Sequence, residues 1–206
     1  MRAALSGQSC FTAASVMACN LKLAKDWSES PKEVSAKAKP RYNFAMNKSL
    51  YNLSEQLGHA LLKNKATVTT AESCTGGGVA SAITDVPGSS KWFHRGFITY
   101  ANQAKQEMLH VSTDLLKAEG AVCEAVVRAM VEGAAQEAGA DYAVAISGVA
   151  GPGGGSSNKP VGTVWFAWLS PQGISCQVHR FTGDRASVRE QAVTISLQEL
   201  LHKVTG

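Results

Sequence analysis

The chain has 206 residues, of which 45% are hydrophobic and 17% are charged, a composition typical of a globular protein with one core. No apolar run reaches the roughly 18 residues that a membrane-spanning helix needs, so we expect no membrane partner. The net charge of +4 comes from residues 1–46, which hold seven basic and three acidic residues, whereas residues 47–206 hold 13 of each. This neutral remainder lacks the clustered basic residues that bind nucleic acid electrostatically, so we expect no nucleic-acid partner.

Residues 1–46 are rich in Ala, Ser and Lys and show no sustained helical or strand period. Three interpretations remain open for them: a disordered extension, a start-site artefact with Met46 as the true first residue, or a weak targeting segment. We expect residues 47–206 to form a single domain.

Alternating helical and strand patterns follow. Leucines recur at helical spacing in residues 48–63, which predicts an amphipathic helix. A β-branched run predicts a strand at 66–71, and Thr75 is placed to cap a helix at 76–84. The remaining expected elements are, in chain order, a strand at 92–100, helices at 101–109, 113–119 and 122–138, strands at 141–147, 161–169 and 174–181, and a final helix capped by Asp184. This order predicts a three-layer α/β/α sandwich with a mostly parallel mixed sheet.

Two of the expected strands end in glycine-rich segments, at residues 72–78 and 147–155. Ligands of open α/β sheets bind at the carboxyl ends of strands, so these segments together could enclose a small polar or phosphorylated ligand. The alternative is that they are tight turns that need positive φ. Neither segment contains the Gly-Lys-Ser/Thr of a phosphate-binding loop, and neither follows the dinucleotide-binding fingerprint closely.

Ser73 at the tip of the first segment is the expected nucleophile. The core histidines His94 and His110 do not sit at strand ends, so Lys105 is the expected base, since a lysine with a lowered pKa can deprotonate a serine. Tyr100 ends the neighbouring strand, and Asn102 shares a helix face with Lys105. The alternatives are a structural serine and a solvated lysine.

Five cysteines are scattered through the chain. No pair has metal-ligand spacing, so we expect free thiols in a reducing cytoplasm and no metal site. Cys74 is a rival nucleophile without an evident base, and its alternative role is a small buried packing residue. Arg185, just before the last helix, is placed either to bind a phosphate or to lie in solvent.

Together these segments closely resemble the CinA C-terminal domain family, over about residues 47–205 and in the short version without a preceding domain. The matching motifs are TAESCTGG at 70–77, GFITY at 96–100 followed by Asn102 and Lys105, ISGVAGPGG at 146–154, KPVGTV at 159–164 and GDR at 183–185. The family's enzymes are nicotinamide-nucleotide amidases. The resemblance therefore implies hydrolysis of nicotinamide mononucleotide to nicotinate mononucleotide and ammonia in pyridine-nucleotide salvage, without a cofactor.

The resemblance also implies residue roles. Ser73 would be the nucleophile, Lys105 its base, and Tyr100 an orienting or proton-relay group. Substrate would be bound by Glu72, Thr75, Gly76, Gly77, Asn102, Ser147, Gly148, Gly151, Gly153 and Arg185, with Arg185 at the phosphate and the amides of 75–77 at the oxyanion. The family further suggests a homodimer.

The chain departs from the family pattern at three positions. Ala101 and Cys123 stand where serine is common, and Ala125 replaces a common proline. These changes remove side chains that can support the nucleophile and base. A catalytically weak or inactive paralogue that binds a pyridine nucleotide is therefore the alternative function. A role in DNA uptake, suggested by the family's competence-damage name, is disfavoured by the neutral core.

Overall fold

The computed structural model describes residues 48–206, and the expectations for residues 1–46 lie outside this part of the chain. Its helices are α2 (Lys48–Asn64), α3 (Gly78–Thr84), the short 3₁₀ helix η1 (Ser89–Lys91), α4 (Asn102–Leu109), α5 (Thr113–Glu119), α6 (Glu124–Ala138) and α7 (Arg185–Thr205). Its strands are β1 (Val68–Glu72), β2 (Phe97–Ile98), β3 (Tyr142–Gly148), β4 (Thr163–Ser170) and β5 (Gly173–Arg180).

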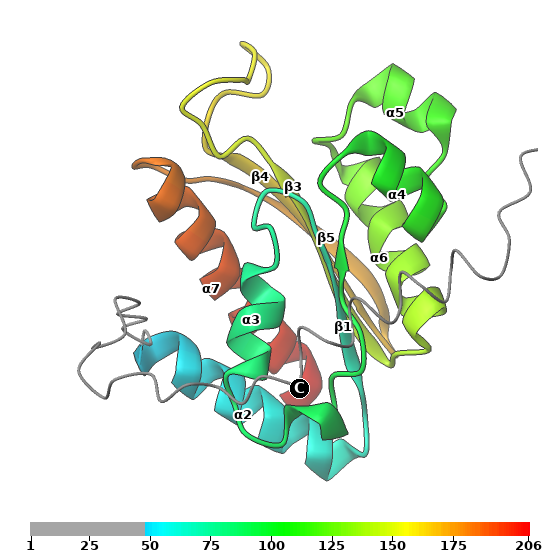
Figure 1. The fold of residues 1–206 in the computed structure, drawn as a ribbon, viewed down its shortest axis with the longest axis vertical. Helices are drawn as coiled ribbons and strands as arrows, with labels where there is room; N and C mark the ends of the chain where they lie inside the picture. Colours follow the sequence, from blue (N-terminus) through cyan, green and yellow to red (C-terminus); the bar gives the residue numbers. More distant parts are fainter. Residues whose placement is uncertain (1–47) are drawn as a thin grey trace, which may run out of the picture. The chain divides into compact units, whose positions relative to one another are not determined.

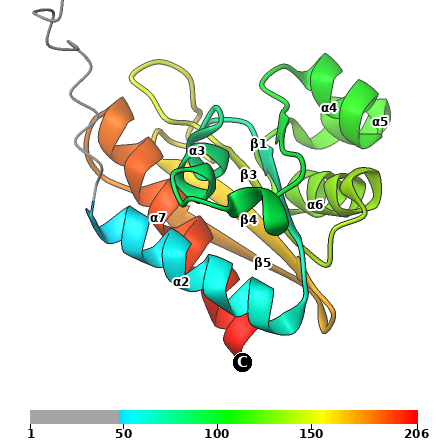
Figure 2. The same cartoon turned by 60° about the horizontal axis from the view of Figure 1, so that its bottom comes forward.

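The strands form one sheet in the order β2-β1-β3-β4-β5 (Figure 1). β1 pairs in parallel with both β2 and β3, whereas β4 runs antiparallel to β3 and to β5. All strands except β4 therefore point the same way. Helices α2, α3 and α7 cover one face and α4, α5 and α6 the other, so the predicted three-layer sandwich with a mixed sheet is confirmed (Figures 1 and 2).

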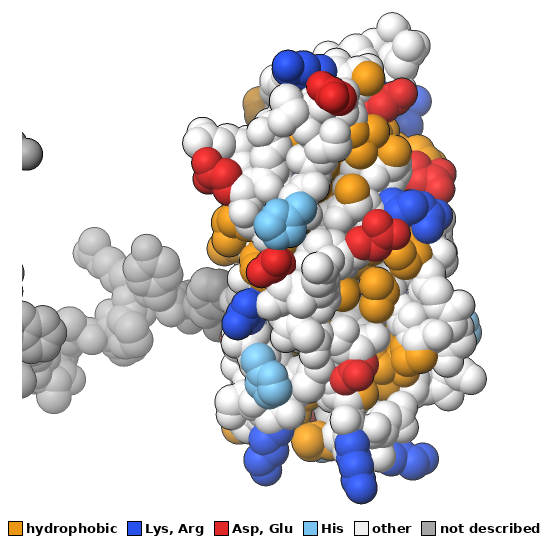
Figure 3. Space-filling view, turned by 90° about the vertical axis from the view of Figure 1, so that its right-hand side faces the viewer, with side chains coloured by type: hydrophobic (Ala, Val, Ile, Leu, Met, Phe, Trp, Pro, Cys, Tyr) orange, Lys and Arg blue, Asp and Glu red, His pale blue; other side chains and the backbone are white. Residues whose placement is uncertain are grey.

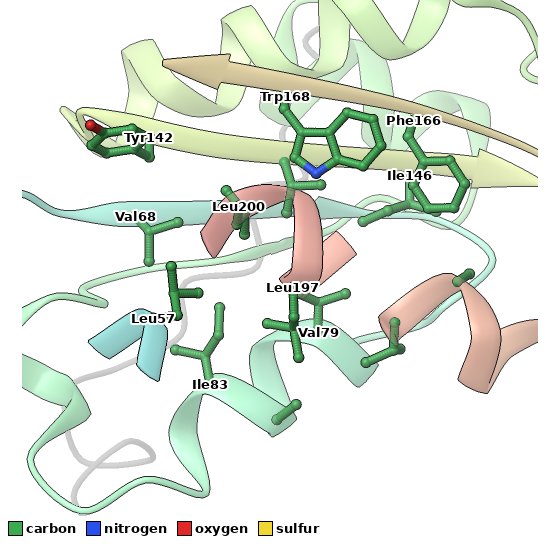
Figure 4. Packing of buried hydrophobic residues seen from close by; sticks show 14 of the residues in the cluster. Leu57, Val68, Val79, Ile83, Tyr142, Ile146, Phe166, Trp168, Leu197 and Leu200 are labelled. Atoms are coloured by element: carbon green, nitrogen blue, oxygen red, sulfur yellow. The ribbon is translucent and has the colours of Figure 1, made fainter. Parts of the chain in front are cut away.

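Large apolar side chains fill the space between the sheet and α2, α3 and α7 (Figure 4). Phe166 and Trp168 on β4 are fully buried and stack with their ring centroids 5.3 Å apart. Leu197 of α7 is also fully buried in this cluster. Burial of such side chains contributes about 1.5–3 kcal/mol each, so this layer makes a large part of the stability.

The opposite face of the sheet presents small side chains to α6, namely Ala71, Ala143, Ala145 and Ala167. Gly133 of α6 faces the α4 end, where a Cβ would lie 2.1 Å from the Leu109 carbonyl oxygen. Helix α6 therefore packs close to the sheet and to the end of α4. Acidic and basic side chains are both present on the outer surface of this layer (Figure 3).

The strand expected at residues 92–100 is much shorter in the structure. Only Phe97 and Ile98 pair with β1, and Phe93 adds an isolated bridge to Val68. Trp92 is buried instead beneath α2, where a Cβ on Gly58 would lie 2.5 Å from its ring. Aromatic content alone does not distinguish an edge strand from a segment that packs its aromatic side chains under a helix.

Candidate active site

Ser73 lies in a turn (residues 72–78, the Ser73 turn) that joins β1 to α3. Its N–H donates to the Ile146 carbonyl at 3.0 Å, and its own carbonyl accepts from the Gly76 N–H at 3.0 Å. The first bond joins the end of β1 to β3, and the second closes the turn. Ser73 is 9% exposed, so its hydroxyl sits at a fixed place at the carboxyl edge of the sheet.

The carboxylate of Glu72 holds this turn from within. It is fully buried and accepts the N–H groups of Gly77, Val79 and Ala80 at 2.8–3.1 Å. The expected capping of this helix by Thr75 is wrong, because α3 begins only at Gly78 and the Glu72 oxygens take up its first donors. The Glu72 carboxylate is occupied in this way, so its place in the structure is inside the turn and not in a cavity for substrate.

Lys105 reaches Ser73 from α4. Its Nζ lies 3.1 Å from Ser73 Oγ, 2.7 Å from the Thr99 carbonyl oxygen and 3.3 Å from the Tyr100 carbonyl oxygen. The side chain is fully buried. Burial lowers the pKa of the Lys105 ammonium from 10.5 to about 8, because desolvation penalises the charged form, while the Coulombic effect of Cys74 acts in the opposite direction. The structure thus brings together the expected nucleophile and the expected base.

Two of the positions at which the chain departs from the family pattern, those where serine is common, are helix N-caps. Ala101 is the N-cap of α4 and Cys123 is the N-cap of α6, and neither side chain makes a capping hydrogen bond. Serine at an N-cap typically stabilises a helix by about 0.5–2 kcal/mol relative to alanine. The sequence therefore lacks two caps, one of them a single turn before Lys105.

Tyr100 and Arg185 contact each other at the rim of the site. The Arg185 guanidinium donates to the Tyr100 hydroxyl at 2.8 Å through Nη2 and to the Gly151 carbonyl at 2.9 Å through Nη1. Tyr100 is 58% exposed, and its hydroxyl bonds to Arg185, not to Ser73 or Lys105, among the described residues. Arg185 thereby links the end of β2 to the loop after β3.

A cavity of about 670 Å³ lies beside this rim. Its lining comes from the loop after β3 and from the start of α7: Ala150, Gly151, Pro152, Val161, Gly183, Asp184, Arg185, Ala186 and Arg189. Ser73 and Lys105 do not line it, but Arg189 connects the cavity to the Ser73 turn, because its Nη2 donates to the Thr75 carbonyl at 2.8 Å. Arg189 is not among the residues expected from the sequence, where its only signal is its position one helical turn after Arg185.

The other expected substrate residues lie in different settings. Ser147 is 1% exposed and donates to the Ala121 carbonyl at 2.7 Å. Gly148 allows β3 and β4 to approach, since a Cβ there would lie 2.7 Å from the Val164 side chain. Asn102 and Gly153 are exposed, and the Asn102 side chain makes no hydrogen bond to the other described residues. Of all the residues expected to bind substrate, only Gly151 and Arg185 line the cavity.

The backbone amides expected at the oxyanion are partly occupied. Gly76 N–H bonds to Ser73 and Gly77 N–H bonds to Glu72. The Cys74 and Thr75 amides make no hydrogen bond to any other of the described residues. The donors left for a ligand next to Ser73 are therefore those of Cys74 and Thr75.

Within residues 48–206, no group of three or more His, Cys, Asp and Glu side chains is placed to hold a metal ion. In the same range, no helix combines the length and apolar character that crossing a membrane would need.

Comparison with known proteins identifies the family of this chain. Residues 50–204 match the model of the CinA C-terminal domain. The chain is 57% identical over 152 residues to nicotinamide-nucleotide amidohydrolase PncC of Escherichia coli strain K12, covering 73% of this chain and 92% of the relative. It is 53% identical over 149 residues to the protein of the same name from Pseudomonas putida, covering 72% and 93%.

A solved structure shows the same architecture. Competence/damage inducible protein CihA from Agrobacterium tumefaciens is 38% identical, has a TM-score of 0.74, and is matched over 77% of this chain and 96% of its own. The motifs, the fold and these relatives together show that this chain belongs to the CinA C-terminal domain family.

Proposed function

We propose that this protein hydrolyses the carboxamide of nicotinamide mononucleotide, giving nicotinate mononucleotide and ammonia, within pyridine-nucleotide salvage. Relatives that are 52–57% identical to it over 149–157 residues bear the name of this activity. The observation that carries the proposal for this chain is the buried contact of 3.1 Å between Lys105 Nζ and Ser73 Oγ.

The surroundings of Lys105 suit a general base. A neutral amine has two N–H donors and one lone pair. The carbonyls of Thr99 and Tyr100 can accept the two hydrogens, which leaves the lone pair directed at the Ser73 hydroxyl. A pKa of about 8 keeps a useful fraction of the amine neutral near neutral pH.

The proposed reaction has two halves. Lys105 takes the proton of Ser73 Oγ as that oxygen attacks the carboxamide carbon, and the resulting oxyanion faces the amides of Cys74 and Thr75. Lys105 then gives the proton to the departing nitrogen, so that the C–N bond breaks, ammonia leaves and an ester forms on Ser73. Lys105 then deprotonates a water molecule, which attacks the ester carbon, and Lys105 returns the proton to Ser73 Oγ as the ester bond breaks.

The test is ammonia release from nicotinamide mononucleotide, measured across a panel of pyridine nucleotides. We expect turnover with the mononucleotide and loss of that turnover in Ser73→Ala. Turnover retained by the Ser73→Ala protein would remove the serine mechanism.

The second candidate is a weak or inactive paralogue that binds a pyridine nucleotide without hydrolysing it. The uncapped starts of α4 and α6 at Ala101 and Cys123 favour it, because α4 carries the base. Thermal stabilisation by nicotinamide mononucleotide without ammonia release would support this candidate. Ammonia release would exclude it.

A further inference from the structure

We propose that Arg189 is a positioning residue, which binds the phosphate of the substrate and, through the Thr75 carbonyl, orders the turn that carries Ser73. The inference rests on the proposed function only for the identity of the anion. It would make the distant phosphate a contributor to the reactivity of the serine and not only to affinity.

One side of Arg189 is committed to the Ser73 turn. Nη2 donates to the Thr75 carbonyl at 2.8 Å and lies 3.6 Å from the position of a Cβ on Gly76. The Thr75 carbonyl and the Gly76 N–H belong to the same peptide group, and that N–H donates to Ser73. The guanidinium therefore sets the orientation of the peptide that closes the turn.

The other donors of Arg189 are unused. Its Nε is buried and has no hydrogen-bond partner, and Nη1 makes no hydrogen bond to any of the described residues. Arginine usually satisfies its donors when it is buried, and the planar guanidinium matches the geometry of phosphate. These unused donors on a side chain that lines a cavity of about 670 Å³ indicate a place for an anion.

The charges around the cavity allow an anion. Arg185 and Arg189 line it together with one carboxylate, Asp184. Asp184 is taken up as the N-cap of α7, where it accepts the Ser187 N–H at 2.8 Å. Both terminal nitrogens of Arg185 already make a hydrogen bond, to Gly151 and to Tyr100, whereas only one terminal nitrogen of Arg189 does, so Arg189 has the larger share of its donors left for an anion.

Phosphate bound to Arg189 would hold the guanidinium against Thr75 and thereby fix the Ser73 turn. Binding energy from a remote, unreactive part of a substrate raises kcat when it is used to position the reacting groups. We therefore expect nicotinamide riboside, which lacks the phosphate, to lose kcat by about tenfold or more relative to the mononucleotide.

The experiment measures kcat and KM for both substrates in the wild type, Arg189→Gln, Arg189→Lys and the control Arg180→Gln, whose arginine is exposed on β5 outside the cavity. We expect inorganic phosphate to raise turnover of the riboside in the wild type and the control. In Arg189→Gln this activation should vanish and the kcat values of the two substrates should converge. Arg189→Lys should recover KM more than kcat, because one ammonium cannot bridge a carbonyl and a phosphate in the manner of a guanidinium.

A second readout needs no amidase substrate. The rate at which a fluorophosphonate labels Ser73 is measured with and without inorganic phosphate, with Ser73→Ala as the control for site specificity. We expect phosphate to accelerate labelling in the wild type and in Arg180→Gln but not in Arg189→Gln. Phosphate-dependent labelling without hydrolysis of either substrate would refute the proposed function and keep the role of Arg189. Full mononucleotide kcat in Arg189→Gln, together with labelling that phosphate does not change, would overturn the inference.

Discussion

The Ser73 turn and the loop between β3 and β4 (residues 149–162, the long loop) are both glycine-rich segments that follow a strand, yet they are held in opposite ways. Residues 72–75 of the Ser73 turn are buried, and the Glu72 carboxylate within the turn accepts the Gly77 amide and two amides of the following helix. Residues 152–158 of the long loop are exposed, and the loop extends beyond the sheet (Figure 1).

Side chains from other elements secure the long loop instead. Arg185 donates to the Gly151 carbonyl near its start, and Lys159 donates to the Glu119 carbonyl at 2.6 Å near its end. A turn whose backbone donors bond to a side chain of the same turn keeps its atoms in place. A loop that is held only at its two ends can change conformation between them. The same glycine-rich composition therefore gives a buried turn of fixed geometry in one segment and an exposed loop that is fixed at its two ends in the other.

The largest effect should come from the tip of the Ser73 turn. Ser73→Ala removes the proposed nucleophile, so we expect ammonia release to fall by about 10³-fold or more. Ser90→Ala, on an exposed residue of η1, is the matched control and should retain activity. Equal activities for the two variants would mean that the turn positions no nucleophile.

The next effect concerns Lys105. Only the neutral amine accepts a proton, so kcat/KM should rise about tenfold per pH unit below the pKa of about 8 and level off above it. Lys105→Met should lose this pH dependence along with about 10²–10⁴-fold in rate. A pH profile for the wild type that is flat between pH 6 and 9 would contradict a lysine base.

Glu72→Gln tests whether the Ser73 turn is held from within. The amide nitrogen that replaces one carboxylate oxygen cannot accept an N–H, so at least one buried donor of α3 loses its partner. We expect a loss of about 1–3 kcal/mol in the free energy of unfolding, measured by denaturant titration. A lower kcat should accompany it, and unchanged stability would show that water or another group replaces the carboxylate.

Tyr100→Phe separates two roles for that residue. If the hydroxyl only accepts the Arg185 hydrogen bond, its loss should raise KM by a few-fold. The corresponding loss of binding free energy should be about 0.5–1.5 kcal/mol at most. A proton relay predicts instead a decrease in kcat of about 10²-fold or more. Steady-state kinetics with the mononucleotide distinguish these outcomes.

The smallest effect should come from the long loop. Lys159→Ala removes the hydrogen bond to Glu119, and we expect KM to rise by no more than about threefold, since an exposed hydrogen bond contributes about 1 kcal/mol or less. Amide hydrogen exchange should quicken in residues 149–162 and stay unchanged in the Ser73 turn. Faster exchange in the Ser73 turn as well would show that the two segments are coupled.

The sequence was sufficient to predict the order of the layers and the approach of Lys105 to Ser73, because neighbouring parallel strands place their ends side by side. It was not sufficient for the details that depend on which backbone group a side chain reaches. Thr75 looked like a helix cap, but the carboxylate of Glu72 folds back to that position. Arg189 shows the same limit, since helical spacing from Arg185 does not reveal its bond to Thr75.

Cys74, immediately after the proposed nucleophile, has a consequence for the chemical durability of the site. Burial raises the pKa of its thiol to about 11, and the side chain is only 5% exposed. At neutral pH about one thiol in 10⁴ is then ionised, and peroxides and alkylating agents react with the thiolate. A buried thiol with so small a thiolate fraction is expected to react slowly with oxidants, so the sulfur beside the Ser73 hydroxyl should resist conversion to a sulfenic acid.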